Sequence, residues 1–244
     1  MRLLILTLAG ILLAGLPSLA GPLTGAPAIK LEVGDPAPGA PAPGNWALGV
    51  GFAMFNFKYE QTVGGTTFGD EWSQSGLIVS AEYAKPLSAG RTLAFGGWLA
   101  PLGSPLGWPD EGTFGQIHGR FGFTPNWGLE VGGLLLDADR IGKMLLHAVY
   151  QTESKGAKPF KLQAGVGLLT GTTVDFRGAR LGTLKTGVSA FANASYPFSQ
   201  SINGYLSVWL LSQKFQWDTA TVGAGIPDST STTVQWSLGV SHDF

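Results

Sequence analysis

The sequence predicts an all-β protein, a transmembrane antiparallel up-and-down β-barrel of ten strands, and three observations support this. Charged residues make up only 13% of the chain against 44% hydrophobic residues, whereas a soluble domain averages about 25% charged residues. After residue 20, no stretch approaches the roughly 18 uninterrupted apolar residues that a membrane helix needs. The apolar residues instead alternate with small or polar ones, which is typical of barrel strands. Because lipid offers the backbone no hydrogen-bond partners, only helices and closed barrels span a membrane, and the barrel remains.

The first 20 residues read as a secretory signal peptide. Arg2 precedes an apolar run over residues 3–16, and Ser18 and Ala20 are the small residues that signal peptidase prefers before its cleavage point. A retained transmembrane anchor is the alternative, but two glycines and Pro17 interrupt the run. The chain contains no cysteine, so a disulfide framework and a thiolate metal site are both excluded.

Residues 21–45 form a leader rich in Pro, Ala and Gly, and residues 46–244 form the barrel. The repeated prolines of residues 36–44 cannot donate ladder hydrogen bonds, so this leader is expected to be an extended periplasmic spacer. A specific peptidoglycan or partner motif is the disfavoured alternative.

Ten segments of the barrel region alternate in hydrophobicity with the length of tilted transmembrane strands. In the first of them the large apolar side chains fall on one face and Ala or Gly on the other, which predicts a narrow barrel. Eight strands are the alternative if the two weakest segments, 91–102 and 143–152, do not pair. The ten segments are 46–58, 72–85, 91–102, 113–124, 127–136, 143–152, 160–170, 183–196, 202–214 and a last strand that ends at Phe244.

The connections between these segments alternate between short and long. Short turns are expected at 86–90, 125–126, 153–159 and 197–201. Longer links are expected at 59–71, 103–112, 171–182 and 218–230, with a shorter one at 137–142. Outer-membrane barrels have short periplasmic turns and long external loops. Both termini are therefore predicted to be periplasmic.

Aromatic residues near the segment ends predict two interfacial girdles, because amphipathic rings favour the membrane interface. The periplasmic girdle would contain Trp46, Tyr83, Phe123, Trp127, Phe160, Tyr196, Phe198 and Phe244. The external girdle would contain Tyr59, Phe68, Trp72, Trp108, Phe114, Phe176 and Trp217.

An ion pair is predicted inside the lumen. If Phe123 pairs with Trp127 around the turn at 125–126, Arg120 lies directly opposite Glu130 on the inward face. Such a pair indicates a plugged or gated lumen rather than large net stability. The alternative is that these residues only solvate a water-filled interior. Further inward polar residues are Glu82, His118, His147, Lys161 and Lys185, and we expect Glu82, Lys161 and Lys185 to extend the pair into a network.

The sequence gives weaker support for an enzyme, a metal-binding protein or a nucleic-acid-binding protein. His118 and His147 point inward, so lumen lining is favoured over a catalytic base at a rim or lipid face. The loop carboxylates at 70–71, 110–111 and 137–139 lack the spacing of a calcium site, so we expect no metal and no cofactor. The formal net charge of −1 and the absence of a basic stripe argue against nucleic acid.

The last strand carries Val234, Trp236, Leu238, Val240, His242 and the terminal Phe244 on one face. This pattern resembles the C-terminal signal that the barrel assembly machinery reads, with Trp236, Leu238, Val240 and Phe244 as its apolar positions. Over residues 46–244 the chain is similar in architecture to the small OmpA-, OmpX- and OmpW-like barrels of the bacterial outer membrane.

The resemblance implies a place in the outer membrane, with lipid, lipopolysaccharide and the assembly machinery as partners. Because eight strands already give a lumen that side chains fill, ten should enclose at most a narrow channel. The favoured function is non-enzymatic, either structural or through the presentation of loops. Transport of a small or hydrophobic solute is the first alternative, and hydrolysis of protein or lipid is the second.

Overall fold

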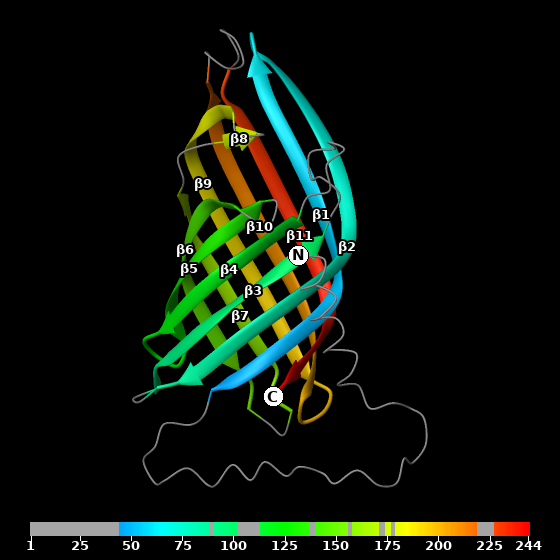
Figure 1. Cartoon of the computed structure of the whole chain (residues 1–244), viewed down its shortest axis with the longest axis vertical. Coiled ribbons are helices and arrows are strands. Elements are labelled where there is room, and N and C mark those ends of the chain that lie inside the picture. The colour runs from blue at the N-terminus through cyan, green and yellow to red at the C-terminus, as the bar shows by residue number, and fades with distance from the viewer. Residues whose placement is uncertain are drawn as a thin grey trace. The chain divides into compact units, whose positions relative to one another are not determined.

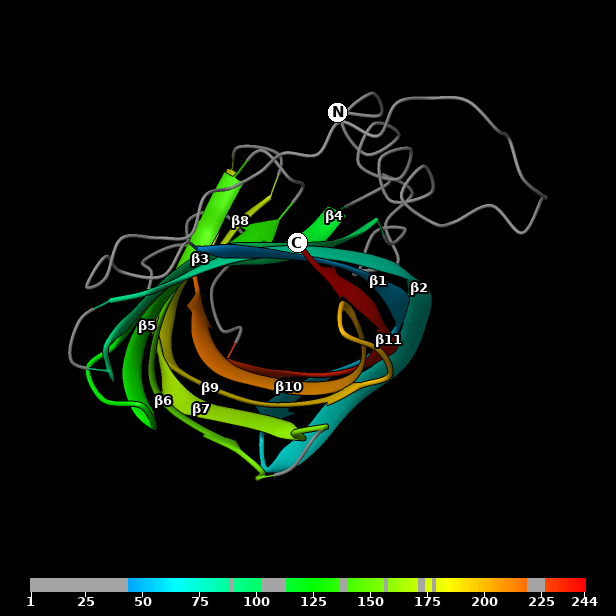
Figure 2. The same cartoon turned by 90° about the horizontal axis from the view of Figure 1, so that it is seen from below.

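The computed structural model describes residues 44–87, 90–101, 113–136, 140–155, 158–170, 174–176, 179–218 and 227–244. These residues form one closed antiparallel barrel (Figures 1 and 2). The predicted signal peptide and nearly all of the predicted leader lie outside the described residues; the first strand begins at Asn45, the leader's last predicted residue. Within the described part of the chain, no helix is long and apolar enough to cross a membrane.

Ten strands make up the wall, as the alternation of the sequence predicts, so the alternative of eight is wrong. They pair in the order β1-β2-β3-β4-β5-β6-β7-β9-β10-β11, and β11 pairs with β1 to close the barrel. A short strand, β8, pairs with β9 alone among the described residues. The bounds are β1 Asn45–Val63, β2 Thr66–Pro86, β3 Thr92–Pro101, β4 Thr113–Gly122, β5 Trp127–Leu136, β6 Arg140–Glu153, β7 Lys161–Thr170, β8 Val174–Phe176, β9 Ala179–Pro197, β10 Ile202–Trp217 and β11 Ser229–Asp243.

The two ends of the barrel differ. The short turns between β2 and β3, β4 and β5, β6 and β7, and β9 and β10 gather with Asn45 and Asp243 at one end, which we call the turn end. The opposite end is the loop end. Figure 1 shows that β1, β2, β9, β10 and β11 rise far beyond β3, β4 and β5 at the loop end, because the former have 15–21 residues and the latter have ten each.

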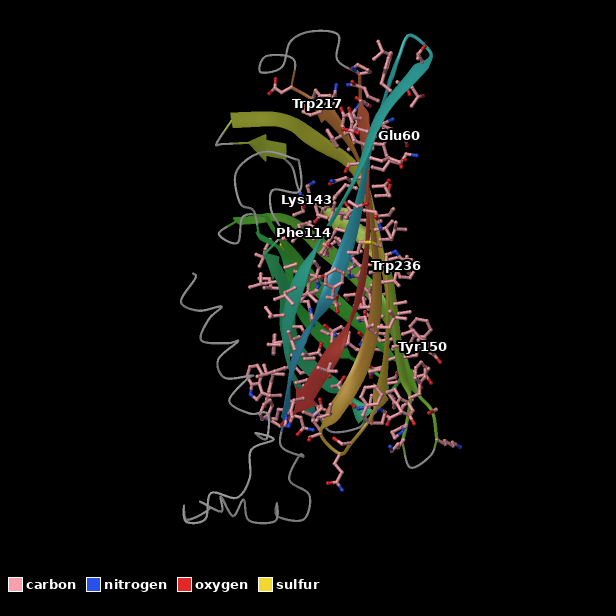
Figure 3. The ribbon with its side chains drawn as sticks, turned by 90° about the vertical axis from the view of Figure 1, so that its right-hand side faces the viewer. Glu60, Phe114, Lys143, Tyr150, Trp217 and Trp236 are labelled. Atoms are coloured by element: carbon pink, nitrogen blue, oxygen red, sulfur yellow. The ribbon has the colours of Figure 1, made fainter. Side chains whose placement is uncertain are left out.

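The outer surface of the wall is apolar. Strand residues alternate between this surface and the lumen, and the exposed members include large side chains from every part of the wall. Leu238 on β11 is 66% exposed, and Trp236 and Tyr150 lie on the same outer surface (Figure 3). An apolar belt around a closed barrel matches a hydrocarbon environment, where lipid replaces water against these side chains.

The predicted loop at 59–71 is wrong, because β1 and β2 continue through it as a hairpin. Val63 pairs with Thr66 around Gly64 and Gly65. Both glycines have positive φ, 57° and 85°, which is the backbone of a two-residue type I′ turn. Inward and outward residues alternate along both hairpin strands, as a pleated sheet requires. The two turn glycines adopt positive φ values that are unfavourable for other residues.

The predicted external girdle is also partly wrong. Phe114 is buried in the lumen, and the Tyr59 hydroxyl and the Trp217 indole nitrogen both bond to the buried Ser229 hydroxyl, each at 2.7 Å. Trp108 lies outside the described residues. Seven of the eight residues predicted for the other girdle are exposed at the turn end, and the eighth, Tyr83, is half-buried beside Trp46 at a ring-centroid distance of 5.2 Å.

Candidate functional site

The lumen is divided into layers, and the layer nearer the loop end is apolar. Strands β1 to β7, β9 and β10 each contribute a side chain to it. Residues of this apolar layer pack against one another as in the core of a soluble protein, and all are buried except Trp98 and Phe191, which are partly buried. Its members are Phe55, Ile78, Trp98, Phe114, Leu134, Leu145, Leu169, Phe191, Trp209 and Leu211.

Ring contacts of the apolar layer cross the lumen from wall to wall. Phe114 on β4 and Trp209 on β10 come from opposite sides of the ten-strand ring, yet their ring centroids are 5.9 Å apart. Phe55 meets Phe114 edge-on at 5.5 Å, and Trp98 meets Trp209 at 6.2 Å. Such distances are those of aromatic rings in contact. The described lumen therefore holds no wide pore at this level.

Sequence reasoning missed this layer. The prediction of a narrow barrel used only the small inward residues at the start of the first segment, whereas Phe55 and Phe57 continue the same inward phase. The inward phase of the ninth predicted strand likewise carries Trp209 and Leu211. Large residues on both faces of one strand are the signal that could have revealed a filled lumen.

A charged cluster lies below the apolar layer, on the turn-end side. The Arg120 guanidinium donates from Nε to Glu130 Oε2 at 3.2 Å and from Nη2 to Glu82 Oε2 at 2.8 Å. His118 Nε2 lies 3.1 Å from Glu82 Oε2, and His147 Nδ1 lies 3.2 Å from Glu130 Oε1. The Arg120–Glu130 pair, predicted from the turn at 125–126, is therefore present and joins both histidines to one network.

The register of the strands explains this cluster. Arg120 pairs with Glu130 across β4 and β5, and Glu130 pairs with His147 across β5 and β6, so all three project from one row of the wall. Burial of the pair is nearly complete, since Glu130 is only 2% exposed. Buried charges need partners on every side, and the network supplies them.

The other predicted lumen lysines are not brought to this cluster. Lys161 lines a cavity at the turn end. Lys185 lies toward the loop end and pairs with Asp228 at 3.1 Å. A third lysine, Lys143, was not singled out by the sequence; it is buried on the loop-end side of the apolar layer and donates to the side chain of Gln213.

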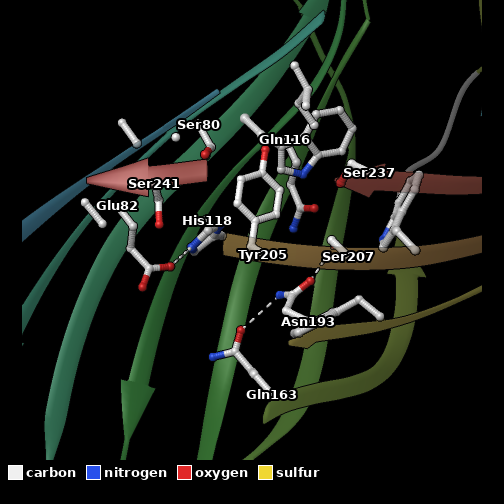
Figure 4. A pocket seen from close by; sticks show the side chains of 18 of the residues that line it. Ser80, Glu82, Gln116, His118, Gln163, Asn193, Tyr205, Ser207, Ser237 and Ser241 are labelled. Carbon is white, nitrogen blue, oxygen red and sulfur yellow. Dashed lines mark hydrogen bonds and ion pairs between the residues drawn. The ribbon is translucent and has the colours of Figure 1, made fainter. Parts of the chain in front are cut away.

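Two neighbouring cavities occupy the turn-end half of the lumen. The inner cavity, about 250 Å³, lies between the apolar layer and the charged cluster, with Trp98 and Trp209 in its lining. Figure 4 shows further lining side chains, among them Gln116, His118 and Tyr205. The vestibule, about 580 Å³, reaches the turns at Pro125 and Glu153. Both cavities are lined by Glu82, Arg120, Gln163, Asn193 and Tyr205. The result is a blind pocket that enters from the turn end and stops at the apolar layer.

Both predicted lumen histidines contact neighbouring side chains. His147 is 0% exposed and contacts Glu130 and the Phe191 ring, and His118 is tied to Glu82 and Arg120. Among the described residues, no group of three or more His, Asp or Glu side chains is arranged to hold a metal ion.

The predicted assembly signal lies on the outer face of β11. Trp236, Leu238 and Val240 are exposed there at every second position, and Phe244 is exposed beyond the end of the strand. The Phe244 amide donates to the Trp46 carbonyl at 2.8 Å, so the last residue is fastened to the first strand.

A closed ten-stranded wall with an apolar exterior defines a transmembrane β-barrel. No family model and no curated protein matches the chain. Among solved structures, the outer membrane protein OprG from Pseudomonas aeruginosa aligns at 12% identity and a TM-score of 0.39, over 82% of this chain and 96% of that one. An outer membrane channel from Pseudomonas putida F1 aligns at 12% identity and a TM-score of 0.45, over 86% and 99%. The outer membrane protein AlkL aligns at 13% identity and 0.37, over 86% and 96%.

Proposed function

We propose that this protein is a non-enzymatic protein of the bacterial outer membrane, with a barrel that is closed inside and serves the envelope structurally or through the loops that it presents. The observation that carries the proposal is the contact of Phe114 with Trp209 across the lumen. A diffusion pore needs a continuous water-filled path, and aromatic rings in contact from opposite walls leave none at that level.

Single-channel current in a planar bilayer tests this proposal. We expect the wild-type protein to be silent and the double variant Phe114→Ala/Trp209→Ala to conduct, because it removes two rings from the apolar layer. Trp236→Ala, on the outer face of the neighbouring strand, is the matched control and should stay silent. Steady large conductance of the wild-type protein would overturn the proposal.

Transport of a small or hydrophobic solute is the second candidate, and the blind pocket at the turn end favours it. Its test is the swelling rate of proteoliposomes in isotonic solutions of small neutral solutes. Swelling faster than that of protein-free liposomes would make transport the leading function. Swelling at the same rate as protein-free liposomes would exclude transport.

The burial of His147 supports the proposed absence of enzyme activity at that histidine. A general base must reach the proton that it removes, and His147 is enclosed by the wall. We expect no protease or lipase activity above background. Activity that disappears in both His118→Ala and His147→Ala would contradict this part of the proposal.

We also propose that the turn end, with both ends of the barrel, faces the periplasm, since short turns are periplasmic in such barrels. A protease site inserted between Gly64 and Gly65, at the tip of the β1–β2 hairpin, should be cleaved in intact cells. The same site inserted between Pro125 and Asn126 should be cleaved only after the outer membrane is permeabilised. The reverse pattern would invert the orientation.

A further inference from the structure

We infer that the vestibule is a binding site for a short neutral saccharide. Such a site goes beyond a structural role, and it does not depend on whether the lumen conducts. Four features of the vestibule lead to this class of ligand: its size and access, the free donors and acceptors of β6 and β7, its balanced charges and the ring of Tyr205.

The vestibule is large enough for such a ligand, and its polar side chains are within reach. Its volume of about 580 Å³ lies within the roughly 300–1,000 Å³ of ordinary ligand pockets. Glu153 and Lys161 line it and are exposed. Gln151 and Gln163 line it and are half-buried. A ligand that enters from the turn end therefore meets all four side chains.

A chain of hydrogen bonds from β10 through β9 to β7 ends in a free donor. The Ser207 hydroxyl donates to Asn193 Oδ1 at 2.5 Å, and Asn193 Nδ2 donates to Gln163 Oε1 at 3.2 Å. These bonds fix the Gln163 amide, because its oxygen is engaged by Asn193. Figure 4 shows the nitrogen of this amide on the side away from Asn193. Among the described residues this nitrogen has no acceptor, so it is left to donate to a ligand.

The neighbouring strand supplies a free acceptor. Gln151 on β6 is directly paired with Gln163 on β7, and its Nε2 donates to the Pro125 carbonyl at 3.0 Å. The Gln151 side-chain oxygen accepts no hydrogen bond from the described residues. The two glutamines thus keep one donor and one acceptor on paired positions of the same wall. A hydroxyl group both accepts and donates, so ligand hydroxyls can satisfy the two together.

A second donor and acceptor lie one step nearer the turn end. Lys161 on β7 is paired with Glu153 on β6, yet no ion pair joins their side chains in the described part of the chain. The donor is again on β7 and the acceptor on β6. Two residues of a strand span about 6.8 Å. A saccharide carries a hydroxyl on most of its carbons, so it can meet both levels at once.

The charges of the vestibule favour a neutral ligand. Lys161 and Glu153 contribute one charge of each sign, so an anion or a cation would meet a like charge beside its partner. Arg120 is held by Glu82 and Glu130, and its guanidinium is not available to an anion. Hydroxyl groups bind ammonium and carboxylate groups equally well, and hydrogen bonds to charged groups are the stronger ones.

The ring of Tyr205 adds an apolar surface. Tyr205 lines the vestibule and lies against the glycine backbone of β1 and β11, since Cβ atoms at Gly51 and Gly239 would lie 2.5 Å and 2.6 Å from its hydroxyl oxygen. The wall therefore holds the ring in place. One face of a sugar ring consists of C–H groups, and such a face packs on an aromatic side chain.

Ligand-observed NMR titration of the protein in nanodiscs, corrected with empty nanodiscs, tests the inference with three probes. Cellobiose is the saccharide, tetraethylene glycol dimethyl ether offers acceptors only, and glycylglycine is a zwitterion. We expect saturable binding of cellobiose, with a dissociation constant at least about fivefold below that of either other probe, which is the effect of one hydrogen bond. No saturable binding of cellobiose, or a preference below fivefold, would overturn the inference.

Variants then locate the site. Gln163→Met removes the free donor and Gln151→Met the free acceptor, so each should bind cellobiose about fivefold more weakly. Gln200→Met is the matched control, because Gln200 is exposed in the turn between β9 and β10 and lies outside the lining of both cavities. Its affinity for cellobiose should equal that of the wild type.

Lys161→Met, at an exposed position, gives the same test if the glutamine variants do not assemble. Wild-type affinity in every assembled vestibule variant, or equal weakening in Gln200→Met, would overturn the inference. The silence of the barrel in a bilayer is measured separately, so failure here leaves the proposed function intact.

Discussion

Glu82 and Arg120 form a 2.8 Å ion pair although a whole strand, β3, separates their own strands β2 and β4. The register places Gly96 of β3 between them, since Gly96 pairs with Glu82 on one side and with His118 on the other. A Cβ atom at position 96 would lie 3.1 Å from Cβ of Glu82 and 2.6 Å from the Ala81 carbonyl oxygen. The absence of a side chain at Gly96 therefore lets the carboxylate pass over β3.

Gly96→Leu should separate Glu82 from the charged cluster. The added side chain would occupy the path of the carboxylate, and overpacking of this kind costs about 1–3 kcal/mol. The free energy of unfolding in urea, with the barrel in lipid, measures the loss. Gly119→Leu is the control, because a Cβ atom there meets only the Phe95 ring at 3.4 Å on the outer face. Equal losses in both variants would show that the path over β3 has no special role.

Arg120→Met should be the most destabilising single change in the charged cluster. It leaves the Glu130 and Glu82 carboxylates in the lumen without their cation, and breaking a buried pair in this way costs about 3–5 kcal/mol. The double variant Arg120→Met/Glu130→Leu should recover much of the loss, because it also removes the more deeply buried of the two stranded carboxylates.

The control for Arg120 is Lys58→Met. Lys58 pairs with Glu60 and Glu71 at 3.1 Å and 3.4 Å on the outside of the barrel, where ion pairs contribute little. We expect its unfolding midpoint to stay at the wild-type value. If Arg120→Met also left the midpoint unchanged, the lumen would be hydrated enough to solvate the carboxylates.

Leu238→Lys tests whether the apolar exterior faces lipid. Leu238 lies midway along β11 and is 66% exposed, and a lysine at the bilayer midplane costs about 2–4 kcal/mol in such barrels. Phe68→Lys, near the tip of the β1–β2 hairpin, is the control and should cost much less. Unfolding from lipid vesicles measures both variants, and a cheap Leu238→Lys would falsify a lipid-facing β11.

Deletion of Phe244 should lower the fraction of protein assembled in the outer membrane. The resemblance of the last strand to an assembly signal predicts this, and the bond from its amide to the Trp46 carbonyl gives it a second role in closure. The measurement is the fraction that shows heat-dependent gel mobility after expression. Phe198→Ala, another exposed aromatic of the turn end, should assemble normally.

The sequence predicted the wall of the barrel well, because alternation is a local property. Both segments that seemed weakest pair on each side, as β3 and β6. The hairpin at Gly64 was missed because its polar residues resemble a loop, although two glycines between alternating residues are a strong turn signal. The Arg120–Glu130 pair could be predicted because only a short turn separates its two strands.

The filling of the lumen could not be predicted in the same way. The contact of Phe114 with Trp209 joins residues 95 positions apart in the sequence, and it exists only once ten strands fix the diameter of the barrel. The predicted extension of the Arg120–Glu130 pair to Glu82 is confirmed, but the glycine on a third strand that leaves room for this contact was not predicted. The periodicity of the sequence shows whether a side chain faces the lumen or the exterior. It does not show which residue that side chain contacts across the lumen.

The uneven strand lengths set an order for unfolding. The first and last strands pair over fifteen residue positions, from Ala47 opposite Asp243 to Gln61 opposite Ser229, whereas β3 and β4 pair over ten and β4 and β5 over nine. Each paired position contributes to a ladder that must break as a unit. The seam where the barrel closes is therefore stronger than the wall across from it, and amide exchange should begin in β3, β4 and β5 while the chain ends stay joined.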